Sequence, residues 1–228
     1  MKKLLSFIML GLIALLVACG DDKEDKAQET IQPQDIKMEE DEKVADDEIV
    51  ISINDTEIDG KRYNTVYLQT KIRASQYGQD IEDKENLKEI TLNEIIAQEL
   101  IKQDAEKQGV KVSEEEVQEE FDTLKEENAD QFDSYLETYS ITEELLKEQI
   151  RFSQTLSKYT EEQIEIEDVT EDDIKETYEQ LKKENENIMS FEEAEPIIKQ
   201  QLTQQREANA LQVKVEELMK EADIKKNI

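Results

Sequence analysis

The chain has 228 residues and is strongly acidic, with 59 Asp and Glu against 28 Lys and Arg, no histidine and one cysteine. Its net charge of −31 argues against nucleic acid as a partner, because contacts to phosphate need Lys and Arg. The single cysteine excludes a disulfide within the chain. Without histidine, neither a Ser-His-Asp nor a Cys-His nucleophile can form, and zinc lacks a favoured ligand. We therefore expect no enzymatic activity, no cofactor and no metal.

The first 18 residues have the three parts of a secretory signal, which are a basic start, an apolar stretch and small residues before a break. Lys2 and Lys3 precede a mostly apolar run, residues 4–18. As a helix this run would extend roughly 22 Å, less than a hydrocarbon core of about 30 Å. Its end, Leu16-Val17-Ala18-Cys19, resembles the bacterial lipobox, so we expect cleavage after residue 18 and a lipid on Cys19. The alternative is an ordinary signal followed by an unmodified cysteine.

A lipid on Cys19 would hold the protein at the cell membrane, on its extracytoplasmic face. Several acyl chains on one residue give stable anchoring, whereas the acidic body would be repelled by anionic lipid. We therefore expect membrane contact through the lipid alone. Residues 20–47 hold twelve acids and four lysines without apolar periodicity. Such a segment buries too little apolar surface to offset chain entropy, so residues 19–47 are predicted to form a disordered tether.

Residues 48–228 are predicted to fold as a mostly α domain that opens with a short pair of strands. Ile49–Ile53 is rich in β-branched residues, Asn54-Asp55 is a turn signal, and Thr56–Ile58 can return as a second strand. Apolar side chains then recur with the helical period as far as residue 222. The last residues, 224–228, either fray or pair with the first strand.

Capping signals predict where the helices begin and end. Asp59 can cap the first helix, and Lys84–Gln108 indicates a long helix that Gly109 ends. Ser113–Glu116 is a capping box before the next helix. Three later helices are expected to open at similar signals: Ser140–Glu143, Thr170–Asp173 and Ser190–Glu193. Pro196 would clash with the turn before it, so the last helix begins either at the Ser190 signal or at Pro196 with one loose turn ahead of it.

The order of these blocks resembles the chaperone domain of the SurA and PrsA foldases, which trigger factor shares in its client-binding part. The similar stretches are the opening strand and turn, the long helix, the glycine stop with the next capped helix, and the closing helix: Ile51–Ile58, Asn93–Ile101, Ala105–Val117 and Ser190–Ile224. Together they span roughly residues 48–227. The resemblance implies an ATP-independent chaperone that binds unfolded or nascent secreted polypeptides.

The sequence departs from these foldases at one place. They usually carry a parvulin prolyl isomerase between the helix around Tyr178 and the closing helix at Ser190. A separate catalytic domain needs on the order of a hundred residues, and only residues 184–189 are present here. The parvulin site also uses histidines, which this chain lacks. We therefore expect a holding domain without prolyl isomerase activity.

Aromatic side chains are the candidates for contact with unfolded clients. They lie on helical stripes, so packing in the core is the competing interpretation for each of them. The candidates are Tyr63, Tyr67, Phe121, Phe132, Tyr135, Tyr139, Phe152 and Tyr178. An acid-rich rim around such a surface would favour basic clients.

Two other classes of protein compete with the chaperone interpretation. A structural or assembly lipoprotein could use the same fold to bind one specific partner, and the sequence does not separate it from a general chaperone. A solute-binding lipoprotein would need an α/β domain pair with a cleft, which the nearly uninterrupted helical stripes disfavour. The sequence does not predict an oligomeric state.

Overall fold

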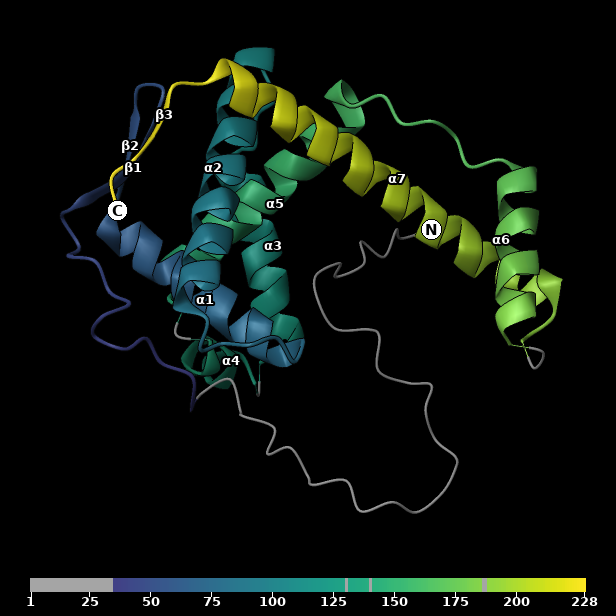
Figure 1. The fold of residues 1–228 in the computed structure, drawn as a ribbon, viewed down its shortest axis with the longest axis horizontal. Helices are drawn as coiled ribbons and strands as arrows, with labels where there is room; N and C mark the ends of the chain where they lie inside the picture. Colours follow the sequence, from purple (N-terminus) through teal and green to yellow (C-terminus); the bar gives the residue numbers. More distant parts are fainter. Residues whose placement is uncertain (1–34, 130, 140, 186–187) are drawn as a thin grey trace. The chain divides into compact units, whose positions relative to one another are not determined.

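The computed structural model of the chain describes residues 35–129, 131–139, 141–185 and 188–228 (Figure 1). The predicted signal peptide, Cys19 and the predicted tether up to residue 34 lie outside the described residues. Within the described part, seven helices and three short strands form a mostly α fold, as the sequence predicted. Among these helices, none combines the length and the apolar character that a membrane span requires.

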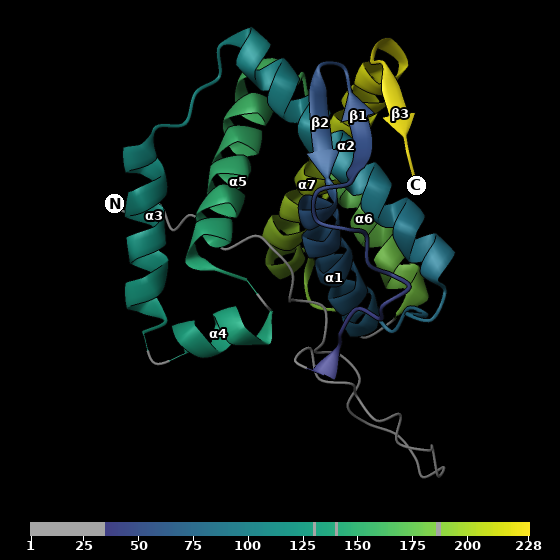
Figure 2. The same cartoon turned by 90° about the vertical axis from the view of Figure 1, so that its left-hand side faces the viewer.

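The sheet joins the start of the domain to its end. Its strands are β1 (Ile49–Ile53), β2 (Thr56–Asp59) and β3 (Ile224–Lys226), in the order β2-β1-β3 with antiparallel pairing. Asn54 makes the hairpin turn with a φ of 52°, in the left-handed region that asparagine tolerates. Figure 2 shows β3 on the side of β1 opposite β2. Of the two alternatives for the C-terminal residues, pairing with the first strand is therefore correct.

Two helices cover the sheet and form the largest core. The Asp59 side chain accepts a hydrogen bond from the Arg62 backbone N–H at 2.9 Å and caps α1 (Gly60–Gln76). Helix α2 runs from Lys84 to Gln108 as predicted, and Gly109 ends it with a φ of 82°. The buried residues between these elements are at most 2% exposed: Val50, Ile51, Ile53, Tyr63, Tyr67, Leu87, Leu92, Ile95 and Ile96.

The next three helices enclose a smaller core. They are α3 (Glu114–Glu127), α4 (Phe132–Thr138) and α5 (Glu143–Gln163). The predicted capping box of Ser113 and Glu116 opens α3, and Thr142 caps α5. The buried residues of this core are Val117, Phe121, Phe132, Ile141, Leu146 and Ile150. Further along, α5 also packs against α2 through Tyr159, which is fully buried beside Ile101 and Ala105.

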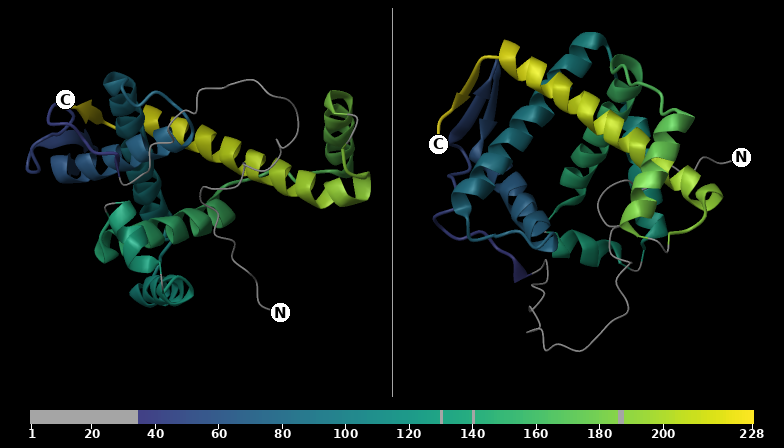
Figure 3. Two further views of the ribbon diagram at one scale, coloured as in Figure 1. Left: turned by 90° about the horizontal axis from the view of Figure 1, so that it is seen from below. Right: turned by 45° about the vertical axis from the view of Figure 1, so that its right-hand side comes forward.

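The closing helices form a third group. Helix α6 (Glu171–Glu184) packs on the first half of α7 (Phe191–Glu221), as Figure 3 shows, and the second half of α7 packs on α2. Of the two alternatives for the start of α7, the Ser190 signal is correct and Pro196 is wrong, because the helix begins at Phe191 and Pro196 lies inside it. The capping box of Ser190 and Glu193 closes the first turn. The proline removes one hydrogen bond to a carbonyl in that exposed first turn, where water can replace it.

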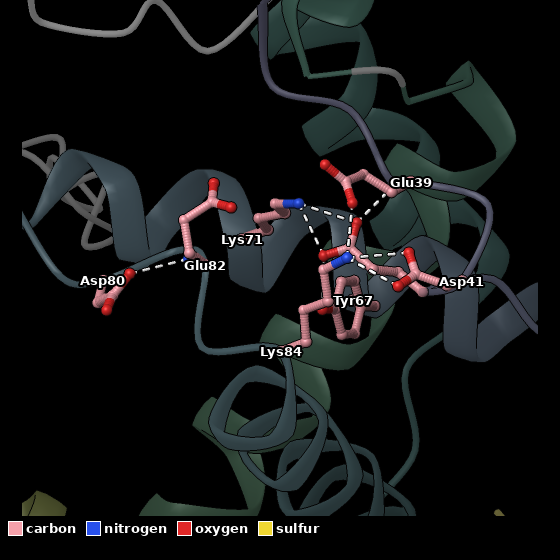
Figure 4. Close-up of polar contacts among 8 residues, drawn as sticks. Glu39, Asp41, Tyr67, Lys71, Asp80, Glu82 and Lys84 are labelled. Carbon is pink, nitrogen blue, oxygen red and sulfur yellow. Dashed lines mark hydrogen bonds and ion pairs between the residues drawn. The ribbon is translucent and has the colours of Figure 1, made fainter.

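The predicted disorder of residues 19–47 is wrong for the last part of that range. Residues 36–48, which we call the strap, lie against α1 and the start of α2 (Figure 4). Ile36 and Glu42 are each 6% exposed, and Met38 and Val44 pack partly buried on the main core. The composition of the strap gave no sign of this, because its binding depends on partners further along the chain.

Candidate functional site

The structure separates the eight aromatic candidates by exposure. Five are core residues, each less than a tenth exposed: Tyr63, Tyr67, Phe121, Phe132 and Tyr178. Tyr139 and Phe152 are half-buried, and Tyr135 is 42% exposed. Packing in the core, the competing interpretation, therefore describes five of the eight. Client contact by any of them stays a prediction, and Tyr135 and Tyr139 are the best placed for it.

Tyr135 and Tyr139 lie one turn apart on and just after α4. Their ring centroids are 4.9 Å apart with an angle of 48° between the planes. Burial against neighbouring groups, with a smaller effect of Tyr139, raises the pKa of the Tyr135 hydroxyl, which therefore stays neutral at physiological pH. The pair thus offers apolar rings with polar hydroxyl tips, which suits both burial and contact with water.

A hydrogen bond connects this pair to the end of α1. The Gln76 side-chain amide donates to the Tyr139 hydroxyl at 3.2 Å. The next residue, Tyr77, is the most exposed of the large apolar side chains in the described part of the chain, at 63%. We call Tyr77, Tyr135 and Tyr139 the tyrosine patch. Tyr77 was absent from the sequence candidates, and its position after the last helical residue of α1 was the signal that could have found it.

Cations lie beside the phenylalanines of the core under α4. Phe121 and Phe132 meet edge to face, with centroids 5.7 Å apart and planes at 86°. Lys147 Nζ lies 4.5 Å from the Phe121 centroid, and Lys125 Nζ lies 5.3 Å from that of Phe132. Lys125 also pairs with Glu143 at 2.6 Å. These contacts hold α3, α4 and α5 together around the smaller core.

A second apolar surface lies where α6 meets the start of α7. Tyr178 and Phe191 pack edge to face with centroids 5.2 Å apart, and the Tyr178 hydroxyl donates to the Met189 carbonyl at 2.9 Å. Lys175 and Lys182 border the open hollow beside these rings. Three large apolar side chains of this region are between 38% and 54% exposed: Leu181, Met189 and Ile197.

Acidic side chains dominate the rest of the described surface without forming a metal site. The described residues contain no group of three or more acidic or other ligating side chains that could hold an ion. Asp173, for example, is held by the capping hydroxyl of Thr170, which lowers the pKa of its carboxyl, and it pairs with Arg206 at 2.8 Å. Such carboxylates cap helices and keep the surface charged.

These features define a mostly helical domain that is closed by a small sheet and carries exposed aromatic side chains. The sequence pattern of the SurA-like N-terminal domain matches residues 1–160, and the chain belongs to that family. The match covers the sheet hairpin and α1 to most of α5, while α6, α7 and β3 lie beyond it. No curated protein matches the chain. Membership of this family indicates a chaperone-like role with polypeptides as substrates.

Proposed function

We propose that this protein is a lipid-anchored, extracytoplasmic chaperone that holds unfolded or nascent secreted polypeptides without ATP and without bond chemistry. The observation that carries the proposal is the tyrosine patch, in which Tyr77 and Tyr135 remain 63% and 42% exposed in a member of the SurA-like family. The lipid at Cys19 and the location outside the cytoplasm are supported by the lipobox-like sequence alone.

The patch favours weak and short-lived contacts. Covering ~100 Å² of apolar ring surface contributes about 2.5 kcal/mol, whereas a micromolar dissociation constant needs about 8 kcal/mol. A client segment held by one such patch would therefore dissociate quickly and could fold between contacts. Capture of a long unfolded chain would need several patches at once, and the exposed residues at α6 and α7 offer a second one.

The absence of isomerase activity is part of the proposal. Helix α6 ends at Glu184 and α7 begins at Phe191, so the connection has no room for a catalytic domain of on the order of a hundred residues. We expect the protein to leave the rate of a proline-limited refolding reaction unchanged. Measurable acceleration of that reaction would contradict this part of the proposal.

The patch can be tested by suppression of client aggregation. We expect the double variant Tyr77→Ser/Tyr135→Ser to require several-fold more protein than the wild type to suppress aggregation of a chemically unfolded client, measured by light scattering. Tyr77 is 63% and Tyr135 42% exposed, and neither belongs to a buried core, so the fold should stay intact, which circular dichroism can check. Val213→Ser on α7, which removes a side chain that is 56% exposed, is the matched control and should behave as wild type.

Two results would overturn the proposal. Wild-type protein that fails to suppress aggregation of several unrelated clients, yet binds one folded partner tightly, would show an assembly lipoprotein. Equal activity of the wild type and the double variant would show that the tyrosine patch does not hold clients. For the anchor, mass spectrometry of the mature protein should find Cys19 at the N-terminus with acyl chains attached, and an unmodified Cys19 would exclude the lipid.

A further inference from the structure

The strap is held by a few specific contacts that all come from α1 and the start of α2. The side chain of Glu42 is fully inaccessible, and its two carboxylate oxygens accept hydrogen bonds from Lys71 Nζ at 2.7 and 2.8 Å. The Tyr67 hydroxyl donates to the same carboxylate at 2.9 Å. Figure 4 shows Lys71 and Tyr67 converging there, with Lys84 beside them. Lys84 pairs with Glu39 at 2.6 Å and with Asp41 at 2.9 Å.

The backbone of the strap is also recognised. The Asn64 side chain accepts from the Val44 N–H at 3.0 Å and donates to the Val44 carbonyl at 2.8 Å, as a neighbouring strand would. At Gly60 the strap comes so close that an added Cβ would lie 2.0 Å from the Ala45 carbonyl oxygen. This surface of α1 thus already binds a peptide by its backbone and by one buried carboxylate.

Other parts of the strap are loosely held. The side chains of Glu40, Asp41 and Glu39 are 93%, 69% and 59% exposed. The strap packs few large apolar side chains, and its path includes a turn at residues 40–42 rather than a regular strand or helix. It can therefore open locally at a lower free energy than the core beneath it, where Tyr63 and Leu92 are almost fully buried.

The chemistry under the strap differs from that of the rest of the molecule. In a chain with 59 acids and 28 bases, two lysines and the Tyr67 hydroxyl meet at one place, and they hold three acidic side chains. Opening the strap would expose the Lys71 ammonium and the Tyr67 hydroxyl, with Lys84 at the edge. A carboxylate with a small apolar side chain near it in the sequence would complement this ammonium and hydroxyl. Glu42 and Val44 of the strap fill these two roles in the closed state.

We propose that this surface, which we call the Lys71 site, is a second polypeptide-binding site that takes an acidic segment of a client when the strap opens. In the absence of a client, the strap occupies this site and competes with client segments for it. The site is therefore closed in most molecules. Because apparent affinity falls with the fraction of open molecules, a variant that loosens the strap should bind acidic peptide more tightly. The identity of the ligand as a client segment rests on the proposed function, whereas the binding of an acidic peptide at this site does not.

The test uses the full chain and a labelled synthetic peptide with the sequence of residues 35–48. We expect Glu42→Gln to bind this peptide at least tenfold more tightly than the wild type in fluorescence anisotropy at physiological salt. Glu40→Gln makes the same charge change at an exposed strap position and should leave the affinity unchanged. Lys71→Met also breaks the buried ion pair, but it removes the cation of the site, so it should loosen the strap without the gain in affinity.

Hydrogen exchange of the same proteins shows whether the strap has opened. In Glu42→Gln and Lys71→Met, amides of residues 36–48 should exchange faster, while those of β1 and α2 keep their protection. If Glu42→Gln loosens the strap but binds the peptide no more tightly than the wild type, the proposal of a second binding site is wrong. Loss of protection in β1 and α2 along with the strap would show that the strap is part of the core. Failure of the wild type to suppress aggregation would instead contradict the proposed function and leave the peptide result standing.

Discussion

The carboxylate of Asp104 connects three helices, because Tyr159 and Lys214 both contact it. Tyr159 on α5 is fully buried and donates to the carboxylate of Asp104 on α2, which is 8% exposed, and Lys214 on α7 lies 3.3 Å from the same carboxylate. Burial, and then the Asp104 carboxylate, raises the pKa of the Tyr159 hydroxyl well above its ordinary value. The hydroxyl therefore remains a donor to Asp104 across the whole physiological range of pH.

We expect Tyr159→Phe to lower the free energy of unfolding by about 1.5–3 kcal/mol, because a hydrogen bond to a buried charged group is lost while the carboxylate stays buried. Urea unfolding measures the change. Tyr178→Phe is the control, since its hydroxyl donates to a neutral carbonyl, that of Met189, at 2.9 Å. The free energy of unfolding of this control should fall by about 1 kcal/mol. Equal losses in the two variants would show that Asp104 does not depend on this donor.

Glu116 gives a prediction about pH. Hydrogen bonding to Lys158, at 2.6 Å, and then to Ser113 lowers the pKa of the Glu116 carboxyl from 4.5 to about 2. Because the folded pKa is the lower one, the charged form stabilises the fold above pH 4.5, and this contribution is lost as the pH falls towards 2.

In Lys158→Met the midpoint of the Glu116 titration, followed by carbon NMR of its carboxyl, should rise towards 4.5. The melting temperature of this variant should also fall less between pH 5 and pH 2 than that of the wild type, because less of the charged-state stabilisation remains to be lost. Unchanged titration of Glu116 in the variant would show that the capping box alone holds the carboxylate ionised.

At the scale of the secondary-structure elements, Pro196 is the least favourable residue in α7. It has no backbone N–H to give to the Glu192 carbonyl one turn earlier, so that hydrogen bond of the helix is missing. We expect Pro196→Ala to raise the free energy of unfolding by about 1–3 kcal/mol in urea and to slow amide exchange in the first turns of α7. The exposed neighbour Glu195→Ala should change the stability little. Unaltered exchange in Pro196→Ala would show that the first turns are already held by the capping box and the contacts of α6.

The elements that could be predicted from the sequence are those set by local signals. Gly109 and the capping box at Ser113 depend on residues a few positions apart, and the end of α2 and the start of α3 followed from them. The position of the strap could not be predicted, because Glu42 is ordered by Lys71, 29 residues away, and acidic composition normally indicates disorder.

For the candidate site, periodicity told which side chains face inward along a helix but not which faces are covered by other elements. Phe121 and Tyr135 both lie on helical stripes, yet one is buried under α4 and α5 and the other is open. Tyr77 continues the stripe of Tyr63 and Tyr67 to the end of α1, but the sequence did not distinguish it from the core residues as a client-binding candidate. Exposure is a property of the packed helices, and only the assembled fold could separate the tyrosine patch from the core.

At the scale of the whole molecule, the net charge of −31 acts on a client before any contact forms. Long-range attraction raises the association rate of oppositely charged partners by 10- to 1,000-fold at low salt and leaves short-range contacts to set the lifetime. The range of this attraction is about 30 Å at 10 mM salt and about 3 Å at 1 M. Under the proposed function, charge would select which unfolded chains arrive, and the tyrosine patch would determine how long they stay.

We expect the protein to associate with a basic unfolded client at least tenfold faster than with an acidic one of the same length at 10 mM salt, measured by stopped-flow fluorescence. At 1 M salt the two rates should become nearly equal, because the charges are screened while apolar contacts remain. Tyr77→Ser/Tyr135→Ser should keep the preference for the basic client and increase both dissociation rates. If the preference for the basic client were unchanged at 1 M salt, specific surface contacts, and not the long-range attraction of the acidic protein, would cause it.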